Sequence, residues 1–243
     1  MEAYISDIAA EGGVLTVSFS GCDFNCPSCN TPQLAEFQTG EQQDLRIVQA
    51  SIADAAPTQI VFTGGEPLLQ RQALLALLRW CREHTNARLI IDTNASKPAV
   101  IEELITEQLV DEFLIDVKAP RDAFDRATHA GTFFIPAEQV FAEFLRSLAI
   151  LRDAQNRVTL SFTTLIVPGL LYTKEDVLAI AALLDGFDAE WTLKPFIGGV
   201  TLDRRLRGLH SPSEHFLDNL ARAVRAAYPN LRIRVQSTAD TVV

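Results

Sequence analysis

The sequence predicts an α/β fold in which six strand–helix units form a partial, TIM-like (β/α)6 barrel. Short apolar runs rich in β-branched residues alternate about six times with longer segments of helical periodicity, a pattern typical of βα units around a parallel sheet. Hydrophobic residues make up 48% of the 243 residues, enough to fill one barrel-sized core. Right-handed crossovers allow such units to curl into a partial barrel, and an open doubly wound sheet is the alternative.

Each predicted element has its own local signal. The first strand ends at Gly21 and the second at Gly64, because glycine commonly follows a strand. Pro98 stands in the first turn of a helix, where proline is tolerated, and Ser211 or Ser213 is the expected cap of the last helix. The predicted strands cover residues 14–20, 59–63, 87–93, 111–118, 157–167, 190–196 and 230–237. The predicted helices cover residues 44–55, 68–84, 97–110, 137–154, 174–187 and 212–228.

Charge and hydropathy exclude several classes of function. The net charge of -10 argues against a broad nucleic-acid-binding surface, which requires clustered lysine and arginine. The sequence contains no run of 18 apolar residues, so it predicts no membrane-spanning helix. The N-terminus lacks a basic stretch followed by an apolar one, so we expect a cytoplasmic protein with neither nucleic acid nor a membrane as partner.

Polar residues and glycines follow the predicted strands at the ends where parallel α/β folds place their chemistry. Taken singly, these residues have simpler explanations: Asp92 and Asn94 as helix caps, and Asp116 with Lys118 as a surface ion pair. Their joint arrangement predicts one site. In strand order they are the Cys22–Cys29 segment, Gly64, Gly65, Glu66, Pro67, Asp92, Thr93, Asn94, Asp116, Lys118, Thr164 and Lys194.

Three of the four cysteines lie within eight residues, in the spacing Cys22-x3-Cys26-x2-Cys29. Thiolates ligate zinc or iron–sulfur clusters. Structural zinc takes four ligands, whereas only three are local here and the histidines show no ligand spacing, so a zinc module is the weaker alternative. A [4Fe–4S] cluster with one open iron fits better, with Phe24 shielding one face. Cys81 lies in a helical pattern and is expected to be a packing residue.

The cysteine segment resembles the signature of the radical S-adenosylmethionine (SAM) enzymes. The segments "TGGEP", "DTNAS", "FLIDVKAP" and "TTLIVPGL" resemble further motifs of that family in the expected order. The resemblance covers about residues 14–200, is followed by a helix and strand at about 211–238, and implies a single radical SAM domain over residues 1–243. It is closest to the activating enzymes of glycyl-radical proteins, of the anaerobic ribonucleotide-reductase and pyruvate formate-lyase types.

The resemblance implies a role for each motif. Cys22, Cys26 and Cys29 would hold the [4Fe–4S] cluster, and with Lys118 they form the predicted catalytic set. Asp92 and Asp116 are candidate ligands of a monovalent cation; the alternative is that Asp116 and Lys118 pair and orient the site. Lys194 faces either the mouth of the barrel or solvent. The residues assigned to cofactor binding are Phe24, Ser28, Gly64, Gly65, Glu66, Pro67, Asp92, Thr93, Asn94, Asp116, Lys118, Val167 and Lys194.

Four positions depart from the family pattern. Ser28 stands where an aromatic residue is usual, and Asn30 where histidine is frequent. Ala95 replaces a glycine, and Ile197 replaces a histidine. These changes lie in the segments that would contact the adenine and the substrate.

The implied activity is reductive cleavage of SAM to a 5′-deoxyadenosyl radical, which would take a hydrogen from a glycine of a partner glycyl-radical enzyme. Flavodoxin or ferredoxin is the expected electron donor. One alternative is a radical SAM enzyme acting on a small molecule or peptide, such as a 7-carboxy-7-deazaguanine synthase; another is a non-catalytic metal-binding protein. The stretch 203–208 is the main basic cluster, and it is either a docking site for an acidic partner or a solvated loop.

Overall fold

The computed structural model describes residues 1–37 and 41–237 and has the α/β composition that the sequence predicts. The chain divides into two compact units. The first contains Met1–Asp23, Gln33–Leu114 and Glu143–Thr159, and the second contains Phe24–Pro32, Ile115–Ala142 and Leu160–Val243.

The first unit contains a mixed sheet of strand order β3-β1-β2-β4-β5. Strands β2 (Val14–Phe19), β4 (Gln59–Gly64) and β5 (Arg88–Thr93) are parallel to one another, as predicted. Strands β1 (Glu2–Glu11) and β3 (Glu41–Asp44) extend it in antiparallel pairing and were not predicted. Only the first half of β1 alternates buried and exposed side chains, so its sequence carries a weak strand signal.

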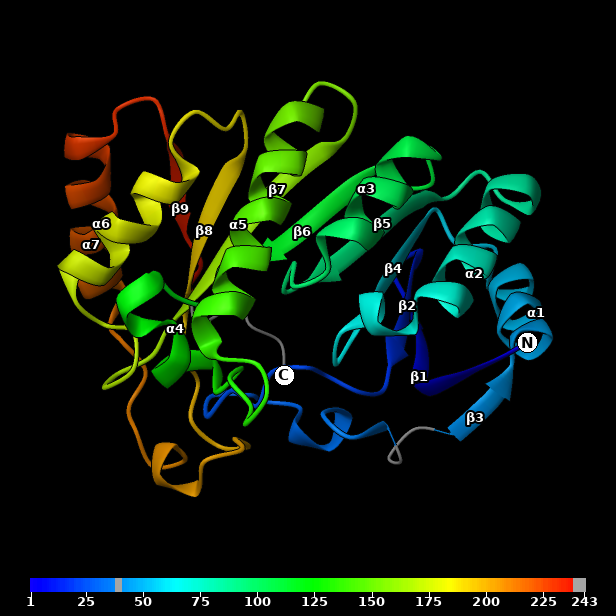
Figure 1. The fold of residues 1–243 in the computed structure, drawn as a ribbon, viewed down its shortest axis with the longest axis horizontal. Coiled ribbons are helices and arrows are strands. Elements are labelled where there is room, and N and C mark those ends of the chain that lie inside the picture. The colour runs from blue at the N-terminus through cyan, green and yellow to red at the C-terminus, as the bar shows by residue number, and fades with distance from the viewer. Residues whose placement is uncertain (38–40, 238–243) are drawn as a thin grey trace. The chain divides into compact units, whose positions relative to one another are not determined.

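In the first unit, one helix follows the antiparallel β3 and two follow the parallel strands β4 and β5. They are α1 (Leu45–Ala55), α2 (Arg71–His84), which follows the 3-10 turn η3 (Pro67–Gln70), and α3 (Pro98–Thr106). Figure 1 shows α1 and α2 side by side. Cys81 of α2 is completely buried, which confirms that it is a packing residue.

The second unit contains the parallel strands β7 (Thr159–Ile166), β8 (Glu190–Pro195) and β9 (Arg232–Val235). Helices α6 (Lys174–Leu184) and α7 (Glu214–Ala227) lie side by side in Figure 1. The side chain of Ser213 caps α7, which decides between the two predicted caps. Strand β6 (Glu112–Asp116) begins in the first unit and ends in the second.

Two further helices connect β6 to β7. Helix α5 (Ala137–Ala154) has the predicted bounds, whereas the short α4 (Arg121–Thr128) was not predicted. The helix predicted for 97–110 ends early, and Gln108 beyond it has a φ of 55°. No helix in the part of the chain that the structure describes has the length and hydropathy needed to cross a membrane.

A buried hydrogen-bond pair ties β7 to β8 in the second unit. The hydroxyl of Thr164 donates to the carbonyl of Val117 at 2.9 Å and accepts from Trp191 Nε1 at 3.0 Å. Thr164 and Trp191 are fully buried, so neither polar group can turn to water instead. Removing the hydroxyl would leave the buried indole N–H of Trp191 without its acceptor.

We therefore expect Thr164→Val to lower the free energy of unfolding by about 1–3 kcal/mol, because the indole N–H is left buried without an acceptor. Thr164→Ser keeps the hydroxyl and should cost about 1 kcal/mol or less. Adding Trp191→Phe to Thr164→Val should cost less than the two single changes together, since both partners are then gone. Urea unfolding measures the wild type and the four variants, Trp191→Phe alone among them. Equal stability of the valine and wild-type proteins would contradict the assignment.

Candidate active site

The predicted site residues divide between the two units. The first unit holds Cys22, Gly64, Gly65, Glu66, Pro67, Asp92, Thr93 and Asn94. The second unit holds Phe24, Cys26, Ser28, Cys29, Asp116, Lys118, Val167 and Lys194.

In the first unit, the segments after β2 and β4 are bonded to each other. The two strands are parallel and Phe19 lies opposite Gly64, so both end at the same edge of the sheet. Beyond this pair, Gly65 N donates to Phe19 O and Glu66 N donates to Gly21 O, each at 2.8 Å. The chain leading into the first cysteine is thereby joined to the glycine-rich segment.

The two glycines leave no room for a side chain. A Cβ at Gly64 would lie 2.1 Å from Phe19 O, and a Cβ at Gly65 would lie 2.3 Å from Gly21 O. Gly64 also has a φ of +124°, which L side chains rarely adopt. The sequence assigned these glycines to the approach of a cofactor. In the structure, the close packing of the protein's own backbone already requires them.

Glu66 is fully buried, and protein donors reach both of its carboxylate oxygens. Its Oε1 accepts from Thr93 Oγ1 at 2.7 Å and from Leu68 N at 3.1 Å, while Oε2 accepts from Asn94 N at 2.8 Å. The pKa of Glu66 is raised to about 8, mainly by burial and secondly by the negative charge of Asp23. The side chain thus joins the segment after β4 to the end of β5.

Asp23, directly after Cys22, is a site residue that the sequence prediction missed. Its carboxylate accepts from Asn94 Nδ2 at 3.0 Å and from Ser96 Oγ at 2.6 Å, and it pairs with Lys97 Nζ at 2.7 Å. These contacts hold the residue beside the first cysteine against the segment that follows β5. No motif marks Asp23, because one carboxylate in a polar loop resembles any solvated surface residue.

In the second unit, backbone hydrogen bonds hold residues 24–32 from two sides. One partner is the end of α4, and the other is the chain just before the 3-10 turn η4 (Arg204–Leu206). The three bonds are Asn25 N to Thr128 O (2.9 Å), Leu202 N to Cys29 O (3.1 Å) and Asp203 N to Pro27 O (3.0 Å).

An aromatic cluster adds side-chain anchoring to this segment. Phe24 is buried and contacts Phe124 edge-on, with ring centroids 5.7 Å apart. Phe124 in turn contacts Phe141 of α5 at 5.0 Å. Edge-to-face pairs of this kind favour a defined loop conformation.

Cys26 is the most buried of the three clustered cysteines. Burial raises the pKa of its thiol to about 11, although the charge of Lys118 acts in the opposite direction. Lys118 Nζ pairs with Asp116 Oδ2 at 2.5 Å. The other oxygen of Asp116 is buried and has no hydrogen-bond partner within residues 1–37 and 41–237. The structure therefore contains the ion pair that the sequence gave as the alternative role of Asp116 and Lys118.

The remaining predicted residues have varied surroundings. Val167 is buried against Phe196 and Leu206, and Lys194 is exposed. Ser28 is half-buried. Asp92 Oδ2 accepts a hydrogen bond from Thr63 Oγ1 at 2.9 Å.

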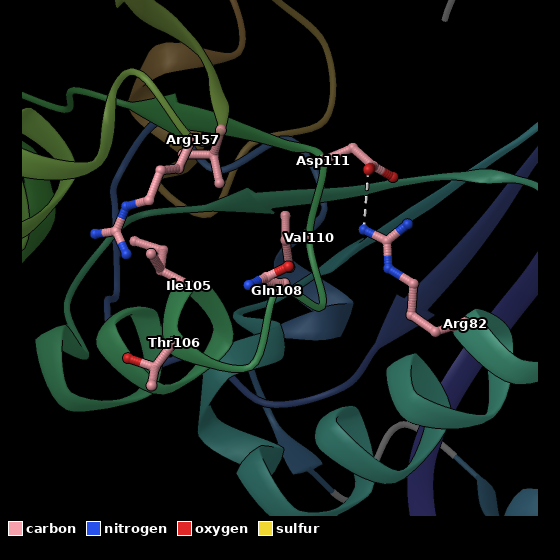
Figure 2. Close-up of a pocket in the computed structure, with 8 residues that line it drawn as sticks. Arg82, Ile105, Thr106, Gln108, Val110, Asp111 and Arg157 are labelled. Carbon is pink, nitrogen blue, oxygen red and sulfur yellow. Dashed lines mark ion pairs between the residues drawn. The ribbon is translucent and has the colours of Figure 1, made fainter.

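A separate pocket of about 540 Å³ lies in the first unit, next to the amino ends of β6 and β7 (Figure 2). Arg82 pairs with Asp111 at its edge, at 2.9 Å. Catalytic groups of parallel α/β folds lie at the opposite, carboxyl ends of the strands. None of the predicted site residues lines this pocket.

Comparison with protein families identifies the chain. The sequence model of the radical SAM superfamily matches residues 16–184. The chain belongs to the radical SAM superfamily. The family implies a [4Fe–4S] cluster and SAM, so the chain is a radical SAM enzyme.

Two curated relatives differ in how much of the chain they match. The "Putative glycyl-radical enzyme activating enzyme" of Methanocaldococcus jannaschii is 29% identical over 217 residues, 88% of this chain and 85% of that protein. The 7-carboxy-7-deazaguanine synthase of Hyperthermus butylicus is 35% identical over 83 residues, 34% of this chain and 35% of that protein.

Solved structures share the fold. A radical SAM methyltransferase from Sphaerobacter thermophilus superposes with a TM-score of 0.69 and 18% identity, covering 94% of this chain and 68% of that one. This likeness confirms the predicted α/β fold of the partial TIM-like barrel type.

The thiol side chains of the three clustered cysteines are of the chemical kind that ligates the cluster implied by the family. All four cysteines are free of disulfides, and three of them lie on one loop that is bonded to its surroundings through the backbone. Three local thiols suit a [4Fe–4S] cluster better than a closed four-ligand zinc site. Backbone hydrogen bonds and the packing of Phe24 hold the loop, and Cys29 Sγ lies 3.9 Å from Thr31 Oγ1.

Ala95 shows how the radical SAM chain accommodates one departure from its family pattern. Its φ of 57° is left-handed, which explains the glycine usual there. The residue is completely buried, and its carbonyl accepts from Ser147 Oγ at 2.6 Å. The left-handed backbone costs about 1 kcal/mol for alanine, and the buried contacts offset it.

We expect Gly64→Ala to lower the free energy of unfolding by about 2–4 kcal/mol, because the new methyl group collides with Phe19 O and the backbone is in a glycine region. Gly208→Ala is the matched control. A Cβ there meets no atom within 4 Å, so the change should stay within about 0.5 kcal/mol. Urea unfolding of the cluster-free chain compares them, and similar losses for both variants would refute the packing argument.

The raised pKa of Glu66 predicts a pH-dependent stability. Between its ordinary value of 4.5 and about 8, the folded chain holds a proton that the unfolded chain releases. The stabilisation is therefore complete below pH 4.5 and is lost as the pH rises through 8. Glu66→Gln removes this dependence.

The measured quantity is the difference in free energy of unfolding between the wild type and Glu66→Gln. Between pH 5 and 7.5, this difference should fall by up to about 1.4 kcal/mol per pH unit. Urea titrations at several pH values measure it. If the glutamine side chain itself changes the stability, it changes the difference by the same amount at every pH. A difference that does not change with pH would show that Glu66 is ionised in the folded state.

Proposed function

We propose that this radical SAM enzyme abstracts a hydrogen atom from a glycine Cα of a partner protein, and so activates a glycyl-radical enzyme. The observation that carries the proposal is the extent of its likeness to the M. jannaschii activating-enzyme relative. That alignment covers 88% of this chain, whereas the H. butylicus synthase aligns with 34% of it.

Cys22, Cys26 and Cys29 would hold the [4Fe–4S] cluster. The cluster and SAM, when bound, supply the reductive cleavage that gives a 5′-deoxyadenosyl radical. The protein's part is to bind, orient and exclude water. The network around Glu66 and Asp23 fixes the segments on both sides of Cys22, and the backbone bonds of Cys29 fix the other end of the loop.

Lys118 would contribute a positive charge toward the carboxylate or ribose of SAM. Its pairing with Asp116 orients the ammonium group, and the charge of Lys118 acts on Cys26 in the same unit. The unpartnered oxygen of Asp116 supports a monovalent cation as a further component, with Asp92 as the second candidate ligand. The protein's own packing and hydrogen bonds already engage Gly64, Gly65 and Glu66. The other cofactor residues named from the sequence keep their proposed roles.

A 7-carboxy-7-deazaguanine synthase-like activity on a small molecule is the second candidate. Several such synthases match parts of this chain, one of them over 76% of its length. Ser28, Asn30 and Ile197 differ from the residues usual in activating enzymes, which favours a changed substrate. The two candidates share the cluster and SAM and differ only in what donates the hydrogen.

Anaerobic reconstitution with iron and sulfide, followed by dithionite and SAM, should give 5′-deoxyadenosine. We expect Cys26→Ser to lower its rate by at least ~100-fold, since a cluster ligand is lost. Cys81→Ser, in the buried fourth cysteine, is the control and should keep cluster content and rate. Full activity of the Cys26→Ser protein would refute the radical mechanism.

The substrate is tested by electron paramagnetic resonance. A glycyl-radical doublet should form on a glycyl-radical enzyme encoded in the same genome when it is mixed with the reduced chain and SAM. If 5′-deoxyadenosine forms without a doublet, and a deazaguanine product appears instead, the second candidate is correct.

A further inference from the structure

Two loops of the second unit present apolar side chains to solvent. We call residues 129–136, between α4 and α5, the aromatic loop, and residues 197–210, around η4, the arginine loop. Phe133 is 96% exposed and Phe134 is 86% exposed. Of the eight large hydrophobic residues exposed in the described part of the chain, five lie in these loops. They are Phe133, Phe134, Ile135, Val200 and Leu209.

The aromatic loop has a defined conformation. Thr132 Oγ1 accepts from Phe134 N at 3.3 Å and from Ile135 N at 3.0 Å, and Thr132 N donates to Ile135 O at 2.7 Å. The rings of Phe133 and Phe134 lie edge-to-face, 5.1 Å apart. Because the loop is held in this way, two aromatic rings stay exposed to water, which is unfavourable in free energy. Burying the rings against a partner would remove that unfavourable term.

The arginine loop is likewise anchored, with its charges outward. Leu206 packs into the cluster of Val167 and Phe196, and Arg207 donates to Thr201 O at 3.0 Å. Arg204, beside these anchors, is exposed. The backbone of the loop is therefore fixed, while its arginine side chains are exposed to solvent.

The charge of these loops opposes that of the whole chain. The arginine loop carries three arginines and one acidic residue, Asp203, which pairs with Arg205 at 2.7 Å. The aromatic loop contains no acidic residue. In a chain of net charge -10, this gives a local positive surface suited to an acidic partner.

Both loops adjoin the cysteine segment within the second unit. The residue before the aromatic loop, Thr128, accepts from Asn25 N, and the arginine loop donates to Pro27 O and Cys29 O. Both loops are thus bonded to the same short stretch of chain, residues 25–29. Figure 1 shows the green connection from α4 to α5 and the orange η4 loop. A partner covering both loops would lie against the backbone that carries Cys26 and Cys29.

We infer that the aromatic and arginine loops together form the docking surface for a small acidic electron-transfer protein that reduces the cluster. This inference rests on the cluster of the proposed function. One electron passes from the reduced donor to the cluster: the donor is oxidised by one electron, the cluster is reduced by one, and no atom is transferred. Weak electron-transfer complexes combine a small apolar contact with charge steering, as this surface offers.

The experiment uses the holoenzyme and an acidic flavodoxin as the probe. Two variants change the surface: Phe133→Ser with Phe134→Ser, and Arg204→Glu with Arg205→Glu. Their matched controls are Ile47→Ser, an exposed apolar residue of α1, and Arg222→Glu, an exposed arginine of α7. All altered side chains are exposed, so thermal unfolding should show little change in stability.

Calorimetric titration with oxidised flavodoxin at low ionic strength should show at least ~10-fold weaker binding for each surface variant and unchanged binding for the controls. The arginine variant should also lose most of the salt dependence of binding. Bleaching of the cluster absorption by reduced flavodoxin should slow in parallel, while bleaching by dithionite stays the same.

Unchanged flavodoxin binding in both surface variants would overturn the inference. The inference would also be overturned if the variants reduced only glycyl-radical formation on the partner enzyme, because the surface would then bind the substrate. It would likewise be overturned if the chain bound anionic lipid vesicles and the variants abolished that binding without weakening flavodoxin binding. Absence of dithionite-driven 5′-deoxyadenosine would instead overturn the proposed function. The titration would still decide the docking surface in that case.

Discussion

The close approach of Gly64 and Gly65 to the backbone of Phe19 and Gly21 is the constraint on which the first half of the site depends. With hydrogen in place of a side chain, the segment after β4 lies directly on the chain that leaves β2, and two backbone hydrogen bonds join them. The direction of the chain into Cys22 follows from this contact. A methyl group at either glycine would have to displace backbone, which cannot move as a side-chain tip can.

Around this contact, the buried side chain of Glu66 and the half-buried side chain of Asp23 hold together segments that are far apart in sequence. Glu66 bonds to the end of β5, and Asp23 bonds to the residues just beyond it. Glu66 accepts three hydrogen bonds from protein donors, and in a buried position such bonds permit few alternative arrangements. The burial that raises the pKa of Glu66 is a consequence of the same packing. Ala95 takes its left-handed conformation within this network.

The second half of the site is held mainly by backbone hydrogen bonds and aromatic packing. The cysteine segment is bonded on one side to the end of α4 and on the other to the arginine loop. An electron donor bound to those loops would therefore contact the elements that position two of the three thiols. Since the rest of the chain is acidic, the positive surface would select both the partner and its orientation. The same scaffold would serve either of the two candidate substrates.

The order of strands and helices, the cysteine motif and the family were all readable in the linear chain, because hydrophobic periodicity and short motifs are local properties. The antiparallel strands β1 and β3 and the short helix α4 were not, because pairing with neighbours stabilises them more than their own patterns do. Tertiary structure alone showed that Glu66 is turned toward protein donors and that Asp23 belongs to the site. It also placed the aromatic and arginine loops beside the cysteines, since contacts between distant segments depend on how the chain packs and leave no mark in the residues between them.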